Sequence, residues 1–439
     1  MRRRRSTHGG NEEHSPCPHF PACGGCYYQG LTEEAVLSIK ETAVREILGE
    51  EVPFDGILKS PLSYGYRNKM EFSFGDDIKD GPLTLGMHAR GSFFNVVSVP
   101  ECMIVDEDYR RVIRAALSYF GPLYEAGRVR YFHRKRQEGY LRHLLVRKGY
   151  HTGEIMVDLV TTSVNGAEEG GEAALLEGFV GVLREIAFDG VLTSVLHTVN
   201  DSVSDAVKDG GTSVLYGQDF ITDEILGLTF KITPFSFFQT NTASAEVLYG
   251  IVRGYVRDAL KASGRGGASV LYDLYSGTGT IAQLMADVAD RVYGVEIVEE
   301  AVEAARENAA ANGLTNCEFI AGDVLEVLGE SAGTGTLTHF SQHSEQPQSL
   351  KKNESMYPSP MTHPDFIILD PPRDGVHPKA LSRIAGYGVP AIVYVSCKPA
   401  SLLKDLPVLY EAGYRVTRSC CLDQFPWTKN VEAVLLLEK

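Results

Sequence analysis

From Pro234 to the C-terminus, segments with helical periodicity alternate with short apolar runs of strand length. The segments in chain order are Ala243–Leu260, Val270–Asp273, Gly279–Ala289, Val292–Glu296, Glu299–Asn312, Glu318–Ile320, Phe366–Leu369, Lys379–Ile384, Ala391–Ser396 and Val434–Leu437. Parallel strands need a long crossover connection, which is usually a helix. The alternation therefore predicts an α/β domain, in which helices cover a mostly parallel sheet.

The first half of the chain has a different pattern. A helix is expected over 32–48, and between about 55 and 225 short runs such as Lys69–Phe74, Phe93–Val99, His143–Val146 and Glu154–Thr161 alternate with Gly and Pro breaks. We expect a polar mobile tail over 1–16, a β-rich domain over 17–225 and the α/β domain over 226–439. Residues 329–364 lack any period and are expected to form a mobile loop inserted into the α/β domain.

Composition narrows the function classes. The 439 residues exceed what one core supports, and the net charge of −15 argues against a protein that coats nucleic acid by bulk electrostatics. No apolar run approaches the ~18 residues that a membrane span needs, so we expect a cytoplasmic protein without a membrane partner. In that compartment the eight cysteines indicate metal binding or catalysis rather than disulfides.

The run LYDLYSGTGT (271–280) places Gly277 and Gly279 between an apolar strand and a helix. Glycines at such a turn let the backbone approach a ligand closely. Glu296 ends the next strand, where a carboxylate can accept hydrogen bonds from ribose hydroxyls. The third glycine of a dinucleotide motif is missing, so the pattern is closer to S-adenosylmethionine sites than to nicotinamide sites. A plain strand-to-helix turn is the alternative interpretation.

Three acids follow three strands: Glu296, Asp323 and Asp370. Ligands of open α/β sheets bind outside the carboxyl ends of the strands, so we expect these acids to face one crevice. For Asp323, a role as a helix cap is an equally good explanation.

Cys397 directly follows the apolar run Ala391–Ser396, in the sequence SCKP. A cysteine there is either a small buried hydrophobe or a nucleophile facing the crevice. Lys398 and Arg373, the latter in DPPR (370–373), are cationic neighbours that are expected to lower the thiol pKa and to favour the thiolate.

Together these motifs resemble the S-adenosylmethionine-dependent RNA uracil-C5 methyltransferases, over nearly the whole chain. The resemblance rests on C-x5-C-x2-C (17–26), YRNKMEF (66–72), PFSFFQTNT (234–242), DLYSGTGT (273–280), DPPRDG (370–375), SCKPASLLKDL (396–406) and FPWTKNVEAVLLLE (425–438). It implies a Rossmann-like class I methyltransferase domain preceded by a β-rich central domain. Residues 1–16 are too few for the N-terminal TRAM barrel of many family members, so we expect that barrel to be lacking.

The resemblance implies that Cys397 is the nucleophile and Glu432 the general base. Uracil C5 is not nucleophilic until a group adds at C6, and a carboxylate must later remove the C5 proton. Taken without the resemblance, Glu432 reads as a surface acid near the C-terminus.

The resemblance also places cofactor-binding residues around S-adenosylmethionine: Gln239, Tyr275, Gly277, Gly279, Thr280, Glu296, Asp323 and Asp370. Gln239 is expected at the methionine end, Glu296 at the ribose and Asp370 near the reaction centre. Thr280, Lys398 and Asn430 depart from the Asn, Asn and His that family members commonly carry at these positions. The last two departures bear on substrate positioning or rate.

Cys17, Cys23 and Cys26 lie within ten residues, with Gly24 and Gly25 permitting a sharp turn. Cys102 is the best candidate for a fourth ligand. Four thiolates suit Zn²⁺ or a [4Fe–4S] cluster, and spacing does not decide between them. The resemblance implies the cluster, since a subset of the family carries one with this spacing.

The stretch 128–148 holds eight Arg or Lys and one acid, with aromatic residues interleaved. This composition suits unstacked RNA, although a solvated basic edge strand is the alternative. We expect a monomer that methylates C5 of a flipped-out uridine, in 23S ribosomal RNA rather than transfer RNA, because the cysteine cluster accompanies ribosomal targets within the family. Three rival hypotheses are a tRNA uridine methyltransferase, an amino-group methyltransferase and a non-catalytic iron–sulfur RNA-binding protein. Arg373 after DPP argues against the amino-group methyltransferase, which would carry an aromatic residue there to stack the base.

Overall fold

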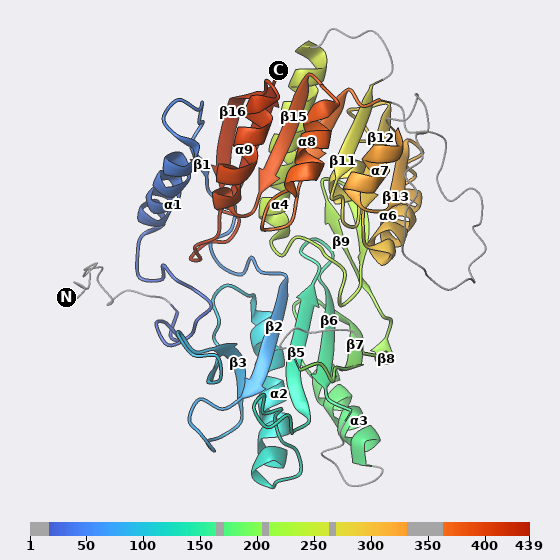
Figure 1. Ribbon diagram of the computed structural model, residues 1–439. Helices are drawn as coiled ribbons and strands as arrows, with labels where there is room; N and C mark the ends of the chain where they lie inside the picture. The colour runs from blue at the N-terminus through green and yellow to red at the C-terminus, as the bar shows by residue number, and fades with distance from the viewer. Residues whose placement is uncertain (1–16, 164–170, 204–209, 263–268, 332–362) are drawn as a thin grey trace, which may run out of the picture. The chain divides into compact units, whose positions relative to one another are not determined.

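A computed structural model of the chain describes residues 17–163, 171–203, 210–262, 269–331 and 363–439 (Figure 1). The predicted tail over 1–16 and residues 332–362 of the predicted loop lie outside the described residues. Contacts divide the chain into two compact units: Met1–Ala43, Ile57–Leu248 and Cys421–Val431 form the first, and Val44–Gly56, Tyr249–Cys420 and Glu432–Lys439 form the second. Both units are therefore built from segments that are distant in sequence.

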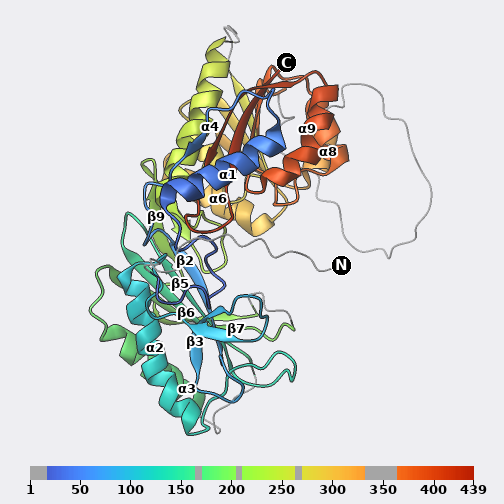
Figure 2. The same cartoon turned by 90° about the vertical axis from the view of Figure 1, so that its left-hand side faces the viewer.

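The first unit contains a seven-stranded sheet of order β4-β3-β2-β5-β6-β7-β8. Its strands are β2 (Lys69–Gly75), β3 (Thr84–His88), β4 (Val96–Ser98), β5 (Leu141–Lys148), β6 (Glu154–Thr161), β7 (Val191–Val199) and β8 (Thr212–Gly217). Helices α2 (Glu107–Glu125) and α3 (Gly171–Arg184) cover one face of this sheet (Figure 2). The rings of Phe74 and Phe179 pack on Phe120, with centroids 5.7 and 5.0 Å away, and all three side chains are buried. The predicted β-rich character of this part of the chain is confirmed.

Two further elements of the first unit bear on the predicted domain boundary. β9 (Ile221–Ile225) and β10 (Leu228–Ile232) form an antiparallel hairpin, so a boundary at 225/226 would fall inside its turn. The observed division falls at Leu248, within α4 (Thr242–Ala262). Helix α1 (Glu33–Leu48) lies close to the range expected from its periodicity.

The second unit contains the strands of an eight-stranded sheet of order β1-β16-β17-β15-β14-β11-β12-β13, except β1 and the last two residues of β16, which belong to the first unit. The strands are β1 (Ile57–Leu58), β11 (Val270–Leu274), β12 (Arg291–Glu296), β13 (Cys317–Ala321), β14 (Phe366–Leu369), β15 (Ala391–Ser396), β16 (Arg415–Leu422) and β17 (Glu432–Glu438). Strands β13, β12, β11, β14 and β15 are adjacent in this order and run parallel to one another. Strand β17 lies on the other side of β15 and pairs with it antiparallel. The predicted α/β fold with a mostly parallel sheet is confirmed.

Helices lie on both faces of this sheet: α8 and α9 side by side on one, and α4 on the other (Figures 1 and 2). The helices are α5 (Thr280–Leu284), α6 (Glu299–Ala311), α7 (Val324–Ser331), α8 (Pro378–Gly386) and α9 (Leu402–Glu411), with a short 3₁₀ turn over Pro399–Ser401.

Three expected elements differ from the structure. The run Phe93–Val99 enters the sheet only at Val96, because Ser92 Oγ accepts hydrogen bonds from the backbone N–H groups of residues 94 and 95 and holds them in a turn. The helix expected over 279–289 is helical only to Leu284, and α7 extends to Ser331, into the segment expected to be loop. Among the described residues, no helix has the length and apolar character required to cross a membrane.

Candidate active site

The glycine turn after β11 has a backbone that requires glycine. Gly277 and Gly279 have φ of 54° and 73°, and Tyr275 has φ of 68°. A Cβ at Gly279 would lie 2.5 Å from the Phe319 ring and 2.9 Å from Ala305 Cβ. The turn therefore keeps its shape only with hydrogen at this position, and the buried Thr280 follows as the first residue of α5.

Glu296 ends β12 and contacts this turn. Its Oε2 accepts a hydrogen bond from Gly277 N at 3.1 Å, and its Oε1 accepts one from Val298 N at 3.0 Å. The carboxylate is thus held beside the glycine turn. Sequence reasoning placed both groups at one ligand site, and the structure brings them together.

Two other residues expected at the cofactor, Asp323 and Gln239, already take part in hydrogen bonds within the protein. Asp323 is exposed, and its Oδ1 accepts a hydrogen bond from Leu325 N at 2.8 Å at the start of α7, so the cap role is realised. Burial and the charges of Asp323 and Asp405 raise the pKa of Tyr275, in the glycine turn, to about 12. Gln239 belongs to the first unit, where its backbone oxygen accepts a hydrogen bond from Asn68 Nδ2 at 2.9 Å.

Cys397 and Glu432 are brought together by the register of β15 and β17. Ser396 at the end of β15 pairs with Ala433, so the same antiparallel register places Cys397 opposite Glu432. The Cys397 side chain is half-buried, and Glu432 is buried with 4% of its surface exposed. A thiol and a buried carboxyl group thus lie opposite each other at the carboxyl end of β15.

Electrostatics link this pair to Asp370, which follows β14. Burial raises the pKa of Asp370 to about 7, and burial together with the charge of Asp370 raises the pKa of Glu432 to about 8. Burial and the charges of Glu432 and Asp370 raise the pKa of Cys397 to about 11. A carboxyl group with a pKa near 8 can exchange protons at neutral pH, as a general base requires.

The expectation of a lowered thiol pKa is wrong for the structure described here. Arg373 does lower the pKa of Cys397, but burial and two neighbouring carboxylates outweigh it because the arginine is exposed. Lys398 is also exposed, and its Nζ lies 3.1 Å from Asp374 Oδ1. The thiol is therefore mostly protonated at neutral pH.

Two buried aspartates were not assigned from the sequence. Asp273 in β11 is fully buried; its Oδ2 accepts a hydrogen bond from Ala282 N at 2.9 Å, and its Oδ1 has no hydrogen-bond partner among the described residues. Burial and the charges of Asp370 and Glu296 hold its pKa well above the usual range. Asp405 accepts hydrogen bonds from Tyr394 Oη and Val376 N, which ties α9 to the segment after DPPR. An acid inside an otherwise apolar run was the available signal in both cases.

Four cysteines of the first unit line one cavity: Cys17, Cys23, Cys26 and Cys102. Burial raises the pKa of Cys26 to about 12 and that of Cys102 to about 11, and charges on the neighbouring cysteines raise both further. The structure therefore brings the four predicted ligands together, in surroundings where several thiolates would need a cation. As the side chains stand, no group of three or more His, Cys, Asp or Glu among the described residues is arranged to hold a metal ion.

The segment around Trp427 is held against the cysteine loop. Tyr27 N and Tyr28 N donate hydrogen bonds to Trp427 O at 2.7 and 2.9 Å. Lys40 of α1 is buried, and its Nζ lies 2.5 Å from Asp423 Oδ1 and donates to Asn430 O at 2.9 Å. Residues 423–430, which precede Glu432 in the chain, are thus fixed by residues from the N-terminal part of the first unit.

The predicted basic stretch is only partly available as a surface. Arg142 and Arg147 are buried and donate hydrogen bonds to backbone oxygens, and Lys148 Nζ lies 2.6 and 2.7 Å from Asp106 and Asp108. These three cations serve the fold because β5 lies inside the sheet. The cations that remain at the surface lie over 128–136, ahead of β5.

The chain is similar in sequence to a family of RNA methyltransferases. Residues 207–439 match the family model described as tRNA (uracil-5-)-methyltransferase. An uncharacterized RNA methyltransferase of Clostridium tetani is 44% identical over 428 residues, covering 96% of this chain and 83% of the relative. A second, from Caldanaerobacter subterraneus subsp. tengcongensis, is 42% identical over 432 residues, covering 98% of this chain and 85% of the relative.

A solved structure is similar over both units. It is the crystal structure of Pyrococcus abyssi tRNA (uracil-54, C5)-methyltransferase in complex with S-adenosyl-L-homocysteine. The TM-score is 0.68 at 27% sequence identity, covering 95% of this chain and 86% of the other.

Proposed function

Because the chain belongs to the tRNA (uracil-5-)-methyltransferase family of RNA methyltransferases, we propose that it methylates C5 of a specific uridine in RNA through a covalent Cys397–C6 adduct. The observation that carries the proposal is the register that sets Cys397 opposite the buried Glu432. A pair of this kind supplies both groups that the reaction needs, a nucleophile for C6 and a base for the C5 proton.

Cofactor binding is part of the proposal. S-adenosylmethionine would supply an electrophilic methyl group on a sulfonium. Glu296 beside the glycine turn would bind the ribose, with Tyr275, Gly277, Gly279, Thr280 and Asp323 around the nucleoside, Asp370 near the reacting methyl and Gln239 at the methionine end. The relative crystallised with S-adenosyl-L-homocysteine supports a ligand of this class.

The first chemical step starts from the singly ionised pair, in which Glu432 is the carboxylate and Cys397 the thiol. Glu432 takes the thiol proton, and the thiolate adds to C6, so that the C5=C6 electrons move into an enolate. The C5 carbon then takes the methyl group, the bond from sulfonium sulfur to methyl breaks, and Glu432 releases its proton to solvent.

Glu432 acts a second time in the elimination step. It removes the C5 proton, the electrons of that C–H bond restore C5=C6, and the bond from Cys397 to C6 breaks. The expelled thiolate recovers the proton from Glu432, so that one proton is released overall. Because burial and the charge of Asp370 raise the pKa of Glu432 to about 8, the same group can accept and release a proton at neutral pH.

For the cysteine cavity we propose a [4Fe–4S] cluster held by Cys17, Cys23, Cys26 and Cys102, with Zn²⁺ as the alternative. The four thiols line one cavity, and the charges of the other three help to raise the pKa of Cys26, so bound iron would stabilise the thiolate form of this group. Its role would be to hold the loop that donates hydrogen bonds to Trp427 O. Anaerobically purified protein should be brown, and stoichiometric zinc without iron would contradict the cluster.

The proposed target is ribosomal RNA, and the alternative is transfer RNA, on which the similar archaeal enzyme acts by its description. Mapping 5-methyluridine in both RNAs from a strain lacking the gene tests the choice. Complementation with the wild type should restore one position, and Cys397→Ser should not. Cys317→Ser is the matched control, because Cys317 is also half-buried and lies in the second unit.

Restoration by Cys397→Ser would contradict the covalent mechanism. A deletion strain with unchanged 5-methyluridine in every RNA would favour a non-catalytic RNA-binding protein instead.

A further inference from the structure

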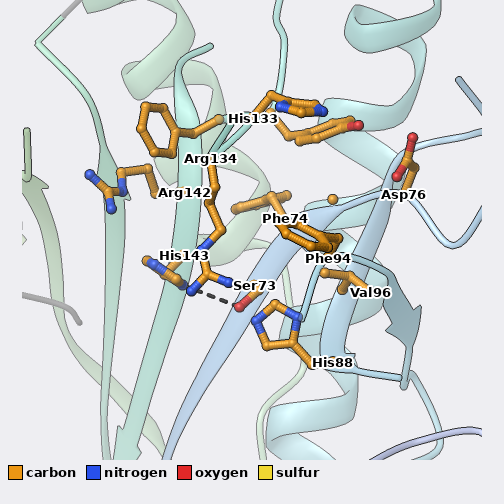
Figure 3. A pocket seen from close by; sticks show the side chains of 13 residues that line it. Ser73, Phe74, Asp76, His88, Phe94, Val96, His133, Arg134, Arg142 and His143 are labelled. Carbon is orange, nitrogen blue, oxygen red and sulfur yellow. Dashed lines mark hydrogen bonds between the residues drawn. The ribbon is translucent and has the colours of Figure 1, made fainter. Parts of the chain in front are cut away.

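The first unit has a second concave site, formed within its own sheet. The hollow lies between β2, the β3–β4 loop and the segment that precedes β5, and water-sized molecules can occupy about 60 Å³ inside it (Figure 3). It is too small to enclose a whole small ligand, whose pockets span roughly 300–1,000 Å³, but it can seat part of a larger ligand at the surface.

The polar groups of the hollow are mainly three imidazoles and two arginines. Its wall includes His88, His133, His143 and Arg134. Ser73 Oγ and His143 Nδ1 lie 3.3 Å apart, and Figure 3 shows Arg134, His143 and Ser73 pointing toward one another. Such groups present hydrogen-bond donors and acceptors to the edge of a base and a cation to a phosphate.

The acid of the hollow is already engaged. Among the described residues that line it, Asp76 is the single carboxylate. Its Oδ2 accepts a hydrogen bond from Asp80 N at 2.9 Å, and a further hydrogen bond with Asp76 helps to raise the pKa of Tyr131. Arg134 and Arg142 also line the hollow, so two positive charges stand against the single negative charge of Asp76.

An exposed aromatic ring stands at the mouth. Phe94 lines the hollow with 52% of its surface exposed, next to Val96, which is buried (Figure 3). Lys135 Nζ lies 4.3 Å from the centroid of the Phe94 ring. An exposed ring with a cation on it is a stacking platform of the kind that binds unstacked bases.

The surroundings favour the same ligand. The exposed cations Arg128, Arg130, Lys135 and Arg136 precede β5, beside the hollow, in a chain whose net charge is −15. A local cluster of cations in an acidic protein attracts a polyanion to that face.

We propose that this hollow binds one unstacked nucleotide of the substrate RNA, with its base on Phe94 and its phosphate at Arg134. The inference rests on the proposed function for the identity of the RNA as substrate. It adds an RNA-binding site in the first unit, built from residues other than those assigned to methyl transfer. One captured nucleotide would set the register of the RNA on the protein.

The test compares Phe94→Ala with Phe93→Ala in the full-length protein. Phe93 is the matched control, since it is the adjacent residue of the same type, is 78% exposed and does not line the hollow. The probe is a short mixed-sequence single-stranded RNA labelled with fluorescein, and the readout is Kd by fluorescence anisotropy. Loss of one stacked base should raise Kd by about 5- to 150-fold for Phe94→Ala, whereas Phe93→Ala should stay within about two-fold of the wild type.

Phe94→Trp provides the rescue arm, because a larger ring should keep the affinity. Photo-cross-linking of the same RNA should label the peptide that contains Phe94. Equal Kd values for the two alanine variants, or cross-links confined to other peptides, would overturn the site. Tight binding of free UMP with no Phe94 effect on RNA affinity would also overturn it and assign the hollow to a soluble nucleotide.

The binding assay does not require methyl transfer. A protein that makes no 5-methyluridine but shows the Phe94-specific loss would overturn the proposed function and leave the site in place. A protein that makes 5-methyluridine but has the same RNA Kd in Phe94→Ala and Phe93→Ala would overturn the site and leave the proposed function in place.

Discussion

The pH dependence of methyl transfer should report the raised pKa of Glu432. In the free protein that pKa is about 8, against an ordinary value of 4.5, whereas the pKa of Cys397 is about 11. The first proton to leave the pair therefore comes from Glu432. The reactive form, with a thiolate and a protonated Glu432, carries the same total charge, so kcat/KM should follow the loss of a single proton.

The magnitude follows from the pKa of about 8. At pH 7 roughly one-eleventh of the pairs have lost that proton, and at pH 9 roughly ten-elevenths have, so kcat/KM for RNA should rise about ten-fold between them. An ordinary glutamate would give no change over this range. The assay is the initial rate of transfer of a radiolabelled methyl group at subsaturating RNA and constant ionic strength, because salt alone changes RNA affinity.

Asp370→Asn provides the perturbation. Its charge raises the pKa of both Glu432 and Cys397, so its removal should move the rising limb to lower pH even if the rate itself falls. Asp374→Asn is the matched control, since Asp374 lies in the same loop, is paired with Lys398 and is exposed. A flat wild-type profile between pH 7 and 9, or an unmoved limb in Asp370→Asn, would refute the reasoning.

Three further predictions concern the supporting structure. Lys40→Met should lower the free energy of unfolding by about 3–5 kcal/mol in urea titrations, because it leaves the Asp423 carboxylate buried without a counter-charge. The control Lys59→Met breaks an exposed pair with Glu33 and should lower it by less than about 1 kcal/mol. Similar losses in the two variants would contradict a stabilising role for the buried pair. Gly279→Ala should weaken S-adenosylmethionine binding at least about ten-fold, measured by calorimetry, because the new Cβ would clash with the Phe319 ring. The control Gly313→Ala has φ of 68° and open space around it, so it adds backbone strain without a clash and should bind S-adenosylmethionine as the wild type does. Cys26→Ala should remove bound iron and the visible absorbance, and retention of both would exclude it as a ligand.

Local pattern was sufficient for the parallel strands and the residues that follow them. Each of β11, β12, β14 and β15 is mostly apolar, and the parallel sheet brings their carboxyl ends to one edge. The position of Glu296 beside Gly277 could be predicted for that reason.

Long-range pairing and desolvation were beyond the reach of local pattern. Glu432 faces Cys397 only because β17 inserts antiparallel beside β15, and nothing in the sequence near Glu432 specifies that neighbour. The direction of the Cys397 pKa depends on how much water is excluded, which neighbouring Lys and Arg residues do not indicate. Likewise, Lys40 and Asp423 are 383 residues apart, and only tertiary structure joins them.

The covalent mechanism is tested most directly by denaturing electrophoresis of Glu432→Gln incubated with substrate RNA and methyl-labelled S-adenosylmethionine. Glu432→Gln lacks the group that takes the thiol proton, so the incubation is run at pH 9, where solvent ionises more of the Cys397 thiol. Removing the charge of Glu432 also removes one cause of the high Cys397 pKa, so addition at C6 and methyl transfer should still occur, though more slowly than in the wild type. Elimination should slow by about 10²–10⁴ for want of a base. The account predicts a protein–RNA adduct that carries the labelled methyl group and is absent from Glu432→Gln/Cys397→Ser. Normal turnover by Glu432→Gln, or RNA binding with no adduct and no labelled methyl, would contradict it.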